Sequence, residues 1–350
     1  MKALIVITGR GLGGDAVIAY NVIKSLEAKN ISCEIALDES APGILFKKKG
    51  YSWHKISIPQ AGGHAATKAS SIKAAFKMLG ATFKVRSLIK KLDVDFVVGI
   101  IGGGAIVGSV GAKLSRTPAI SLCSTPLDLK VCPKFNPCLI FPELDLFRHE
   151  VLPKNIERTY YPLNEDVDSG VSQIALEKLK EIPLFDENKK TILFSSGSSI
   201  FKGTIEAISK LSKCSDEYNL ILVGHPLEDE YLDLIDESKI IYLGYIDWLK
   251  HIYKFIDLAV LTDDGVMLEE AIACKVPTIA LTRIKWGRYH NMAGVFKGAI
   301  LESSVDDICL NIGEAFKNYE SLKNSANNYS EIVLNTRNLL AGKIISVCGK

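Results

Sequence analysis

The 350-residue sequence lacks acidic residues over a long stretch of its first half. No Asp or Glu occurs in residues 40–92, where eleven residues are Lys or Arg. Residues 1–150 hold 20 Lys and Arg against 11 Asp and Glu, a balance of +9, whereas the remainder has a balance of −7. This asymmetry predicts an anionic partner for the first half alone.

Long hydrophobic runs are also lacking. The apolar run at residues 3–7 is too short for a signal peptide, and no run is long enough to span a bilayer. The composition is nevertheless that of a globular protein, with 47% hydrophobic residues. Because 350 residues are too many for one ordinary hydrophobic core, we expect two domains.

Cysteine patterns typical of metal sites are absent. The eight cysteines are scattered, no C-x-x-C pair occurs, and Cys132 and Cys138 have no histidine near them. We therefore expect no metal and no cofactor, and we interpret the cysteines as reduced thiols of a cytoplasmic protein.

A strand, a glycine-rich turn and a helix follow one another twice in the first half. Glycine at such a turn lets the backbone approach a ligand closely, although tight packing of strand on helix explains it comparably well. The repeated order predicts an α/β fold with a doubly wound parallel sheet. The strands are expected at residues 3–7, 32–37, 53–58, 95–101, 119–123 and 139–141. The glycines of the two turns are Gly11, Gly13 and Gly14, and Gly103 and Gly104.

The basic stretch includes one or two amphipathic helices in residues 64–92, with apolar residues on one side. Such a helix can lie on an anionic membrane surface. A core-packed helix with a solvated lysine face is the alternative, and the absence of acidic residues favours a membrane or another polyanion. Nucleic acid is not expected, because no binding motif accompanies the charge.

The second half restarts after a polar segment at residues 152–168, which we interpret as the linker. A strand at 191–194 precedes SSGSS at 195–199, a predicted turn in which hydroxyl and backbone N–H donors suit a diphosphate. N-capping of the next helix by serine explains the same residues equally well. Further strands are expected at 220–223, 240–243, 258–261 and 277–281.

The stretch at residues 262–291 is the most informative part of the chain. It begins with TDDG, continues as a helix with Glu269 and Glu270 near its start, and ends in a basic, aromatic loop. The N-terminus of a helix favours a phosphate, and a carboxylate near it can accept hydrogen bonds from ribose. An ordinary βαβ unit whose acidic residues complement the helix dipole is the alternative interpretation.

The pattern D-x-G-x(3)-E-E-A at residues 263–271 and GYID at 244–247 resemble the nucleotide-sugar site of GT-B glycosyltransferases. Together with the N-terminal glycines, they are similar to the MurG-like N-acetylglucosaminyltransferases. The resemblance implies two Rossmann-like domains facing a cleft. Residues 1–160 would bind the acceptor and the membrane, residues 161–335 the nucleotide sugar, and residues 336–350 would cross back to the first domain.

The resemblance also implies an activity. It is inverting, metal-independent transfer of an N-acetylhexosamine from a UDP-sugar to a lipid-linked or glycan acceptor, on the cytoplasmic face of the membrane, in cell-wall or glycolipid synthesis. Glu270 would hold ribose, and the backbone of Ile246 would hold the uracil edge. The implied nucleotide-sugar residues are Ser196, Gly197, Ser198, Ile246, Gly265, Glu269, Glu270, Arg288, His290 and Asn291. The implied acceptor residues are Gly11, Gly13, Gly14, Gly103 and Gly104.

The sequence departs from the family in two places. The first glycine loop usually ends in histidine, and here the position holds Asp15, which becomes the candidate general base. The family's glutamine pair is absent near His290, so the identity of the sugar does not transfer.

Two other functions remain open. TDDGVMLEEA also resembles the non-hydrolysing UDP-N-acetylglucosamine 2-epimerases without a gap, but those enzymes carry acidic residues after the central strand, where this chain has GIIG at 99–102. The third is a non-catalytic protein that binds a nucleotide sugar or a polyanion. Asp15, Glu270 and His290 argue against it.

Overall fold

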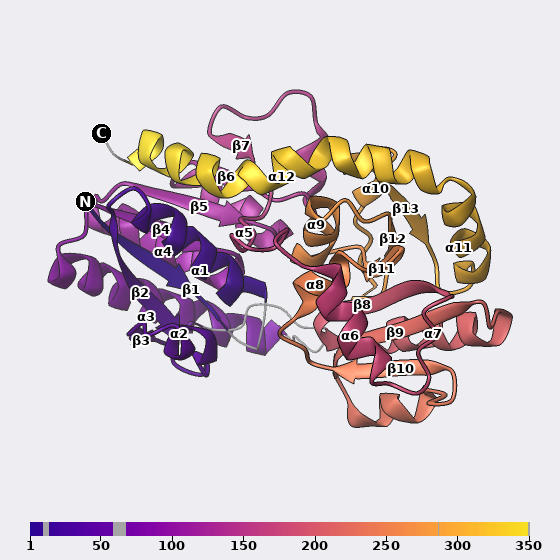
Figure 1. The fold of residues 1–350 in the computed structure, drawn as a ribbon. Helices are drawn as coiled ribbons and strands as arrows, with labels where there is room; N and C mark the ends of the chain where they lie inside the picture. The colour runs from indigo at the N-terminus through magenta and orange to yellow at the C-terminus, as the bar shows by residue number, and fades with distance from the viewer. Residues whose placement is uncertain (10–13, 59–67, 286, 349–350) are drawn as a thin grey trace. The chain divides into compact units, whose positions relative to one another are not determined.

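The computed structural model describes residues 1–9, 14–58, 68–285 and 287–348, and for residues 68–76 the helical backbone alone. The chain forms two compact units (Figure 1). The first contains Met1–Pro162 and Asn335–Lys350, and the second contains Leu163–Leu334.

The described residues of the first unit form a parallel sheet in the order β3-β2-β1-β4-β5-β6-β7. Its strands β4 and β5 are buried at every residue, which explains their continuous apolar sequences. The strands are β1 (Lys2–Ile7), β2 (Ser32–Asp38), β3 (His54–Ile56), β4 (Phe96–Ile100), β5 (Ala119–Cys123), β6 (Cys138–Ile140) and β7 (Ile156–Arg158). The helices are α1 (Gly14–Glu27), α2 (Ile44–Lys48), α3 (Lys68–Leu92), α4 (Gly102–Ser115), α5 (Pro126–Val131) and the 3-10 turns η1 (Cys132–Lys134) and η2 (Asp145–Arg148).

The second unit repeats the arrangement with the parallel order β10-β9-β8-β11-β12-β13. The strands are β8 (Lys190–Ile200), β9 (Tyr218–Pro226), β10 (Ile240–Gly244), β11 (Leu258–Thr262), β12 (Thr278–Leu281) and β13 (Ile300–Ser303). The helices are α6 (Ser172–Lys180), α7 (Lys202–Cys214), η3 (Asp229–Leu234), α8 (Leu249–Tyr253), α9 (Val266–Ala273), α10 (Met292–Val295), α11 (Ile308–Lys317) and α12 (Tyr319–Cys348), which continues into the first unit.

The strand order reverses once in each sheet. The strand β1 lies between β2 and β4, and β8 lies between β9 and β11. Loops that leave the carboxyl ends of strands at such a reversal diverge and leave a crevice that binds ligands in doubly wound folds. The predicted pair of doubly wound, Rossmann-like domains is therefore confirmed.

The predicted turn at residues 195–199 is wrong, because β8 continues through it to Ile200. The pairing with β9 shifts between Ser195 and Ser199, as in a β-bulge, and then resumes as Ser199 opposite His225. The Ser195 hydroxyl stabilises the bulge by donating to the carbonyl of Val223 in β9 at 2.8 Å.

The segment interpreted as a linker also contains a strand. The strand β7 pairs with β6 at the edge of the first sheet, and the two units divide after Pro162. In the basic stretch, the described backbone of residues 68–92 is one helix, α3, and residues 64–67 lie outside the described residues. No helix in the described ranges has both the length and the apolar character that crossing a bilayer requires.

The interpretation of all cysteines as unpaired thiols is wrong for one pair. Cys214 at the end of α7 and Cys309 in α11 form a disulfide across a sequence separation of 95 residues. The two helices pack against each other, a proximity that the sequence alone does not indicate. The described free cysteines are Cys33, Cys123, Cys132, Cys138, Cys274 and Cys348.

Candidate functional site

The polar turns singled out in the second half come together at the switch point of the second sheet. Ser195 of β8 lies directly opposite Leu261 of β11, so the SSGSS bulge and the TDDG turn leave neighbouring strands at the same edge. This edge is where doubly wound domains bind ligands.

The bulge uses two of its serines internally. The Ser195 hydroxyl also accepts the N–H of Gly197 at 3.1 Å. The Ser196 hydroxyl lies 2.7 Å from the hydroxyl of Thr204 and accepts the N–H of Phe201 at 3.1 Å. Phe201, rather than a serine, is the N-cap of α7 and has no side-chain capping bond, so the N-capping alternative is wrong.

Gly197 leaves open space at the bulge. Its φ of 101° is a conformation that favours glycine, and a Cβ built there meets no atom within 4 Å. Ser198, the remaining candidate, follows in the same bulge and is partly exposed. A ligand can therefore approach this backbone without displacing a side chain.

The second turn ends in Gly265, the N-cap of α9. Its φ is 93°, and it has no side chain with which to cap the helix. Asp264, the residue before it, forms an ion pair with Lys285, with 2.8 Å between Oδ1 and Nζ. An uncapped helix start with an ammonium group beside it favours an anion.

Asp263 links this turn to the basic loop, a role that the sequence analysis missed. Its side chain is buried, and its Oδ2 accepts the N–H of His290 at 2.9 Å. Burial raises the pKa of Asp263 to about 6, an effect that this hydrogen bond from His290 opposes. The residue therefore holds the loop after β12 against the start of α9.

The adjacent glutamates differ in burial. Glu269 is completely buried, whereas Glu270 is partly exposed and accepts a hydrogen bond from the Tyr253 hydroxyl at 3.2 Å. Burial of the carboxylate raises the pKa of Glu270 to about 7. Of the two, only Glu270 has a side chain that solvent reaches.

The other predicted nucleotide-sugar residues lie on loops at the same edge. Arg288 is exposed, and Asn291 is the N-cap of α10, with its side-chain oxygen accepting the N–H of Gly294 at 2.7 Å. Ile246 lies between β10 and α8 and is partly exposed. Its backbone N–H and carbonyl bond to no other described residue.

In the first unit, Asp15 has a structural contact at the candidate acceptor loop. It lies in the first turn of α1 with Gly14, and its carboxylate accepts the N–H of Gly9 at 2.7 Å. Gly9 has φ of 63°, and a Cβ there would lie 2.2 Å from the Leu37 side chain. Gly11 and Gly13 lie outside the described residues.

Gly103 and Gly104 lie in the first turn of α4, directly after β4. A Cβ on Gly104 would approach the Cα of Ile7 to 2.9 Å, so this glycine permits close packing of α4 on β1, as the packing interpretation predicted. Gly103 is partly exposed.

A buried carboxylate that the sequence analysis did not single out stabilises this second glycine turn. Asp128, in α5, accepts the N–H of Gly102 at 2.7 Å. It also accepts the N–H groups of Ser124 at 3.3 Å and Thr125 at 3.0 Å. Burial raises the pKa of Asp128. These bonds hold the strained turn in which Ile101 has φ of 46°, a conformation rare for β-branched residues.

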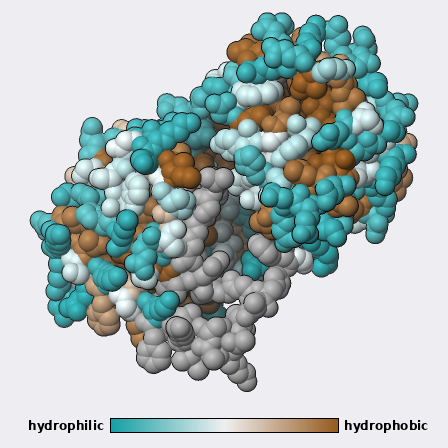
Figure 2. Space-filling view, turned by 90° about the horizontal axis from the view of Figure 1, so that it is seen from below, coloured by the Kyte–Doolittle hydropathy of each residue, from teal (hydrophilic) through white to brown (hydrophobic). Residues whose placement is uncertain are grey.

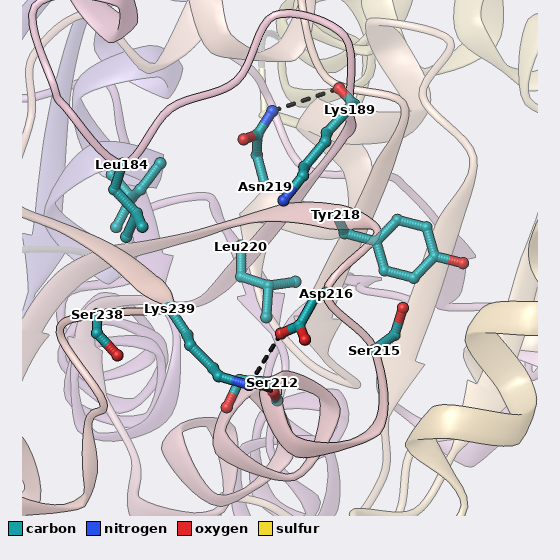
Figure 3. Close-up of a pocket in the computed structure, with 11 residues that line it drawn as sticks. Leu184, Lys189, Ser212, Ser215, Asp216, Tyr218, Asn219, Leu220, Ser238 and Lys239 are labelled. Carbon is teal, nitrogen blue, oxygen red and sulfur yellow. Dashed lines mark hydrogen bonds and ion pairs between the residues drawn. The ribbon is translucent and has the colours of Figure 1, made fainter.

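A separate small pocket lies at the opposite, amino-terminal edge of the second sheet (Figure 3). Its lining includes Lys189, Asn219 and the Lys239–Asp216 ion pair, with 2.8 Å between Nζ and Oδ1. Its volume of about 80 Å³ is well below the roughly 300–1,000 Å³ typical of ligand pockets. We therefore do not assign the nucleotide sugar to it.

Within the ranges that the structure describes, no group of three or more His, Cys, Asp or Glu side chains is placed to hold a metal ion.

Solved structures of nucleotide-sugar enzymes share this fold. MurG from Acinetobacter baumannii superposes with a TM-score of 0.67 at 15% identity, covering 99% of each chain. The UDP-GlcNAc 2-epimerase from Neisseria meningitidis gives 0.67 at 15% identity, covering 99% of this chain and 100% of the epimerase. Anabaena HepE, solved in complex with UDP, gives 0.72 at 15% identity, covering 99% and 100%. The chain thus has the GT-B fold.

Within that class, the sequence resembles the MurG-like group. It is 25% identical over 256 residues to the UDP-N-acetylglucosamine–N-acetylmuramyl-(pentapeptide) pyrophosphoryl-undecaprenol N-acetylglucosamine transferase of Sulfurihydrogenibium sp., covering 73% of this chain and 70% of the relative. It is 26% identical over 295 residues to the transferase of the same name from Clostridium novyi, covering 79% and 78%. No family model matches the sequence. The resemblance inferred from the motifs is confirmed.

Proposed function

We propose that this chain is an inverting glycosyltransferase that moves N-acetylglucosamine or a related N-acetylhexosamine from a UDP-sugar to a lipid-linked acceptor in cell-wall precursor synthesis. The observation that carries the proposal is the pairing of the open Gly197 bulge with the Gly265 turn at one switch point. The similarity to transferases of that activity supports it.

The donor is assigned to the second unit. The backbone of Ile246 binds the uracil edge, and Glu270 accepts hydrogen bonds from ribose. The diphosphate lies between Gly197 and the start of α9, and the sugar lies against the loop that carries Arg288 and His290. Glu269 and Asn291 support this site from within, because the first is buried and the second caps α10.

The reaction is a displacement at the anomeric carbon. An acceptor hydroxyl attacks that carbon, the bond to the diphosphate oxygen breaks with inversion, and the hydroxyl proton passes to a base. We assign the base to Asp15 in the first unit. Backbone dipoles and cationic side chains stabilise the charge that develops on the diphosphate, so the proposed transfer is independent of a metal and of a cofactor.

The acceptor is assigned to the glycine turns of the first unit. Gly14 and Gly103 expose backbone there, and Asp128 holds the neighbouring Gly102 in place.

We further propose that the protein lies peripherally on the cytoplasmic face of an anionic membrane. Leu79 and Phe83, one helical turn apart on α3, are 54% and 56% exposed. Lys77 and Lys84 beside them are also exposed. Figure 2 shows several separate apolar patches on the face in view, so an apolar patch alone does not support membrane binding. The proposal rests on the combination of this pair with lysines, in a stretch, residues 40–92, that has no acidic residue.

The second candidate is a UDP-N-acetylglucosamine 2-epimerase, favoured by the gapless TDDGVMLEEA match. In the turn after β4, the carboxylate of Asp128 accepts the N–H of Gly102. The Asp128 side chain is completely buried and accepts three backbone N–H groups, so it has no exposed surface with which to take a proton from a sugar.

One experiment separates the two activities. The protein is incubated in D₂O with UDP-N-acetylglucosamine, with and without a lipid-diphosphate-linked sugar acceptor. A transferase releases UDP and forms an inverted, β-linked product when the acceptor is present. Deuterium at C2 of the recovered UDP-sugar, without acceptor, would instead identify an epimerase and overturn the proposal.

A further inference from the structure

Lys285 is a cation within the switch-point site that no motif indicated. It lies in the loop after β12, and its Nζ forms the 2.8 Å ion pair with Asp264. A Cβ built on Gly265 would lie 3.7 Å from this Nζ. The same Nζ lies 5.8 Å from the ring centre of Phe201, the N-cap of α7. One ammonium group therefore lies beside the Gly265 turn and near Phe201, which follows the SSGSS bulge by two residues.

The loop that carries Lys285 is held in place from both sides. A Cβ on Gly203, in the first turn of α7, would lie 2.6 Å from Cδ1 of Ile284, so the Ile284 side chain packs directly on that helix. The bond from His290 N–H to Asp263 holds the other side of the loop. The Lys285 side chain is only 18% exposed, which limits the positions that its ammonium group can occupy.

Among the described residues, the ion-pair partner of this ammonium group is one carboxylate, from the residue before the glycine turn. The Asp264 side chain is 25% exposed, so solvent reaches part of the carboxylate, although its ion-paired Oδ1 is buried. A diphosphate carries more negative charge than one carboxylate and presents several acceptor oxygens, so it competes well for an ammonium group.

We propose that Lys285 binds the β-phosphate of the nucleoside diphosphate, and that Asp264 is the internal anion which this phosphate replaces. The assignment rests on the proposed function. When the anomeric C–O bond breaks, its electron pair goes to the β-phosphate oxygen, and the Lys285 charge stabilises it. Lys285 keeps its protons, and the proton of the acceptor hydroxyl goes to the base.

Calorimetric titration with UDP and with uridine tests this assignment, because uridine lacks the phosphates. Lys285→Met should weaken UDP binding by about 10–100-fold, the range for a hydrogen bond to a charged group, and leave uridine binding unchanged. Lys285→Arg should restore part of the loss. Asp264→Asn should strengthen UDP binding several-fold, because the competing anion is removed. Lys297→Met, an exposed lysine of the same unit, is the matched control.

The outcomes separate the two proposals. The assignment of Lys285 is wrong if Lys285→Met binds UDP with wild-type affinity, or if its affinity for uridine falls as much as its affinity for UDP. The proposed nucleotide site can still be correct in either case. If the wild type binds neither ligand, the proposed function fails, and the assignment fails with it.

Discussion

Glu269 and Glu270 illustrate how burial separates neighbouring residues of one type. The first has no exposed surface, and the second reaches the site edge but contacts Tyr253. Tyr253 is itself buried, so the pair brings a carboxylate to the border of the core, where its charged form is disfavoured.

Glu270 should make stability depend on pH. Its pKa is raised from 4.5 to about 7 in the folded chain, so the folded state binds the proton more tightly than the unfolded state. The unfolding free energy should therefore fall as pH rises from about 4.5 through 7. Asp263, whose pKa is raised from 3.8 to about 6, contributes in the same direction at lower pH.

Urea unfolding of wild type and Glu270→Gln at pH 6 and 8 measures this effect. The variant should show a smaller loss of stability between the two pH values, and it should be the more stable protein at pH 8. Glu181→Gln, at an exposed glutamate, should behave as wild type. If the unfolding free energy changed equally between pH 6 and 8 in all three proteins, burial of Glu270 would not be the cause of the pH dependence.

Glu270 should also determine nucleoside affinity. Glu270→Ala is expected to weaken uridine and UDP equally, by roughly 1.5–3 kcal/mol, because both ligands carry the ribose. Calorimetry on both ligands provides the measurement. A loss confined to UDP would place Glu270 at the diphosphate, and no loss would remove it from the site.

Asp15 gives the prediction for catalysis. General-base assistance is typically worth about 10²–10⁴-fold, so Asp15→Asn should reduce turnover by that factor. UDP affinity should stay unchanged, since we assign UDP to the other unit. The Asn side-chain oxygen can still accept the Gly9 N–H that now bonds to Asp15, which preserves the loop. Near-wild-type turnover with the lipid-linked acceptor would exclude Asp15 as the base.

At the scale of elements, the helices on one side of the second sheet are joined covalently. The bond between Cys214 and Cys309 connects α7, which follows the SSGSS bulge, to α11. Cross-linking distant positions restricts the unfolded chain and thereby stabilises the fold. The helix α7, which begins beside the proposed diphosphate site, is thus cross-linked to α11 at its C-terminal end.

Removal of this disulfide should destabilise the protein. For a separation of 95 residues, the double variant Cys214→Ser/Cys309→Ser is expected to lose about 3–5 kcal/mol of unfolding free energy. Thermal unfolding with and without reductant checks this. Reductant should lower the Tm of wild type and of the control Cys33→Ser, but not that of the double variant. Identical Tm values in all conditions would mean that the two thiols are not bonded in solution.

At the scale of the whole molecule, charge differs between the two halves, whereas exposed apolar residues occur in both. The first 150 residues carry a formal net charge of +9, and the remaining residues carry −7. On α3, the exposed pair Leu79 and Phe83 lies among lysines, whereas Leu310 on α11, 74% exposed, belongs to the acidic half.

Membrane binding should follow this asymmetry. The protein is expected to sediment with anionic liposomes and less with neutral ones, and added salt should release it, because surface charges are screened over roughly 8 Å at physiological ionic strength. Leu79→Ser/Phe83→Ser should weaken the binding, and Leu310→Ser should not. Equal binding to both lipid types, or none to either, would mean that α3 is an ordinary solvated helix.

The sequence by itself determined the fold class and the positions of most strands. Strands buried on both faces need continuous apolar runs, such as those at 96–100 and 258–262, and the glycines between strand and helix mark where the chain reverses. These signals lie within a few residues of one another, so they can be read without the fold. They also located the turn at Gly265, whereas Gly197 lies in a bulge of β8 and not in the predicted turn.

Only the tertiary structure decided which groups meet at those turns. Asp128 reaches Gly102 across 26 residues, Cys309 reaches Cys214 across 95, and Lys285 meets Asp264 because β12 lies beside β11. The bulge in β8 likewise depends on the register with β9. Such contacts form because strand order brings distant loops to one edge, and no local pattern of residues encodes that order.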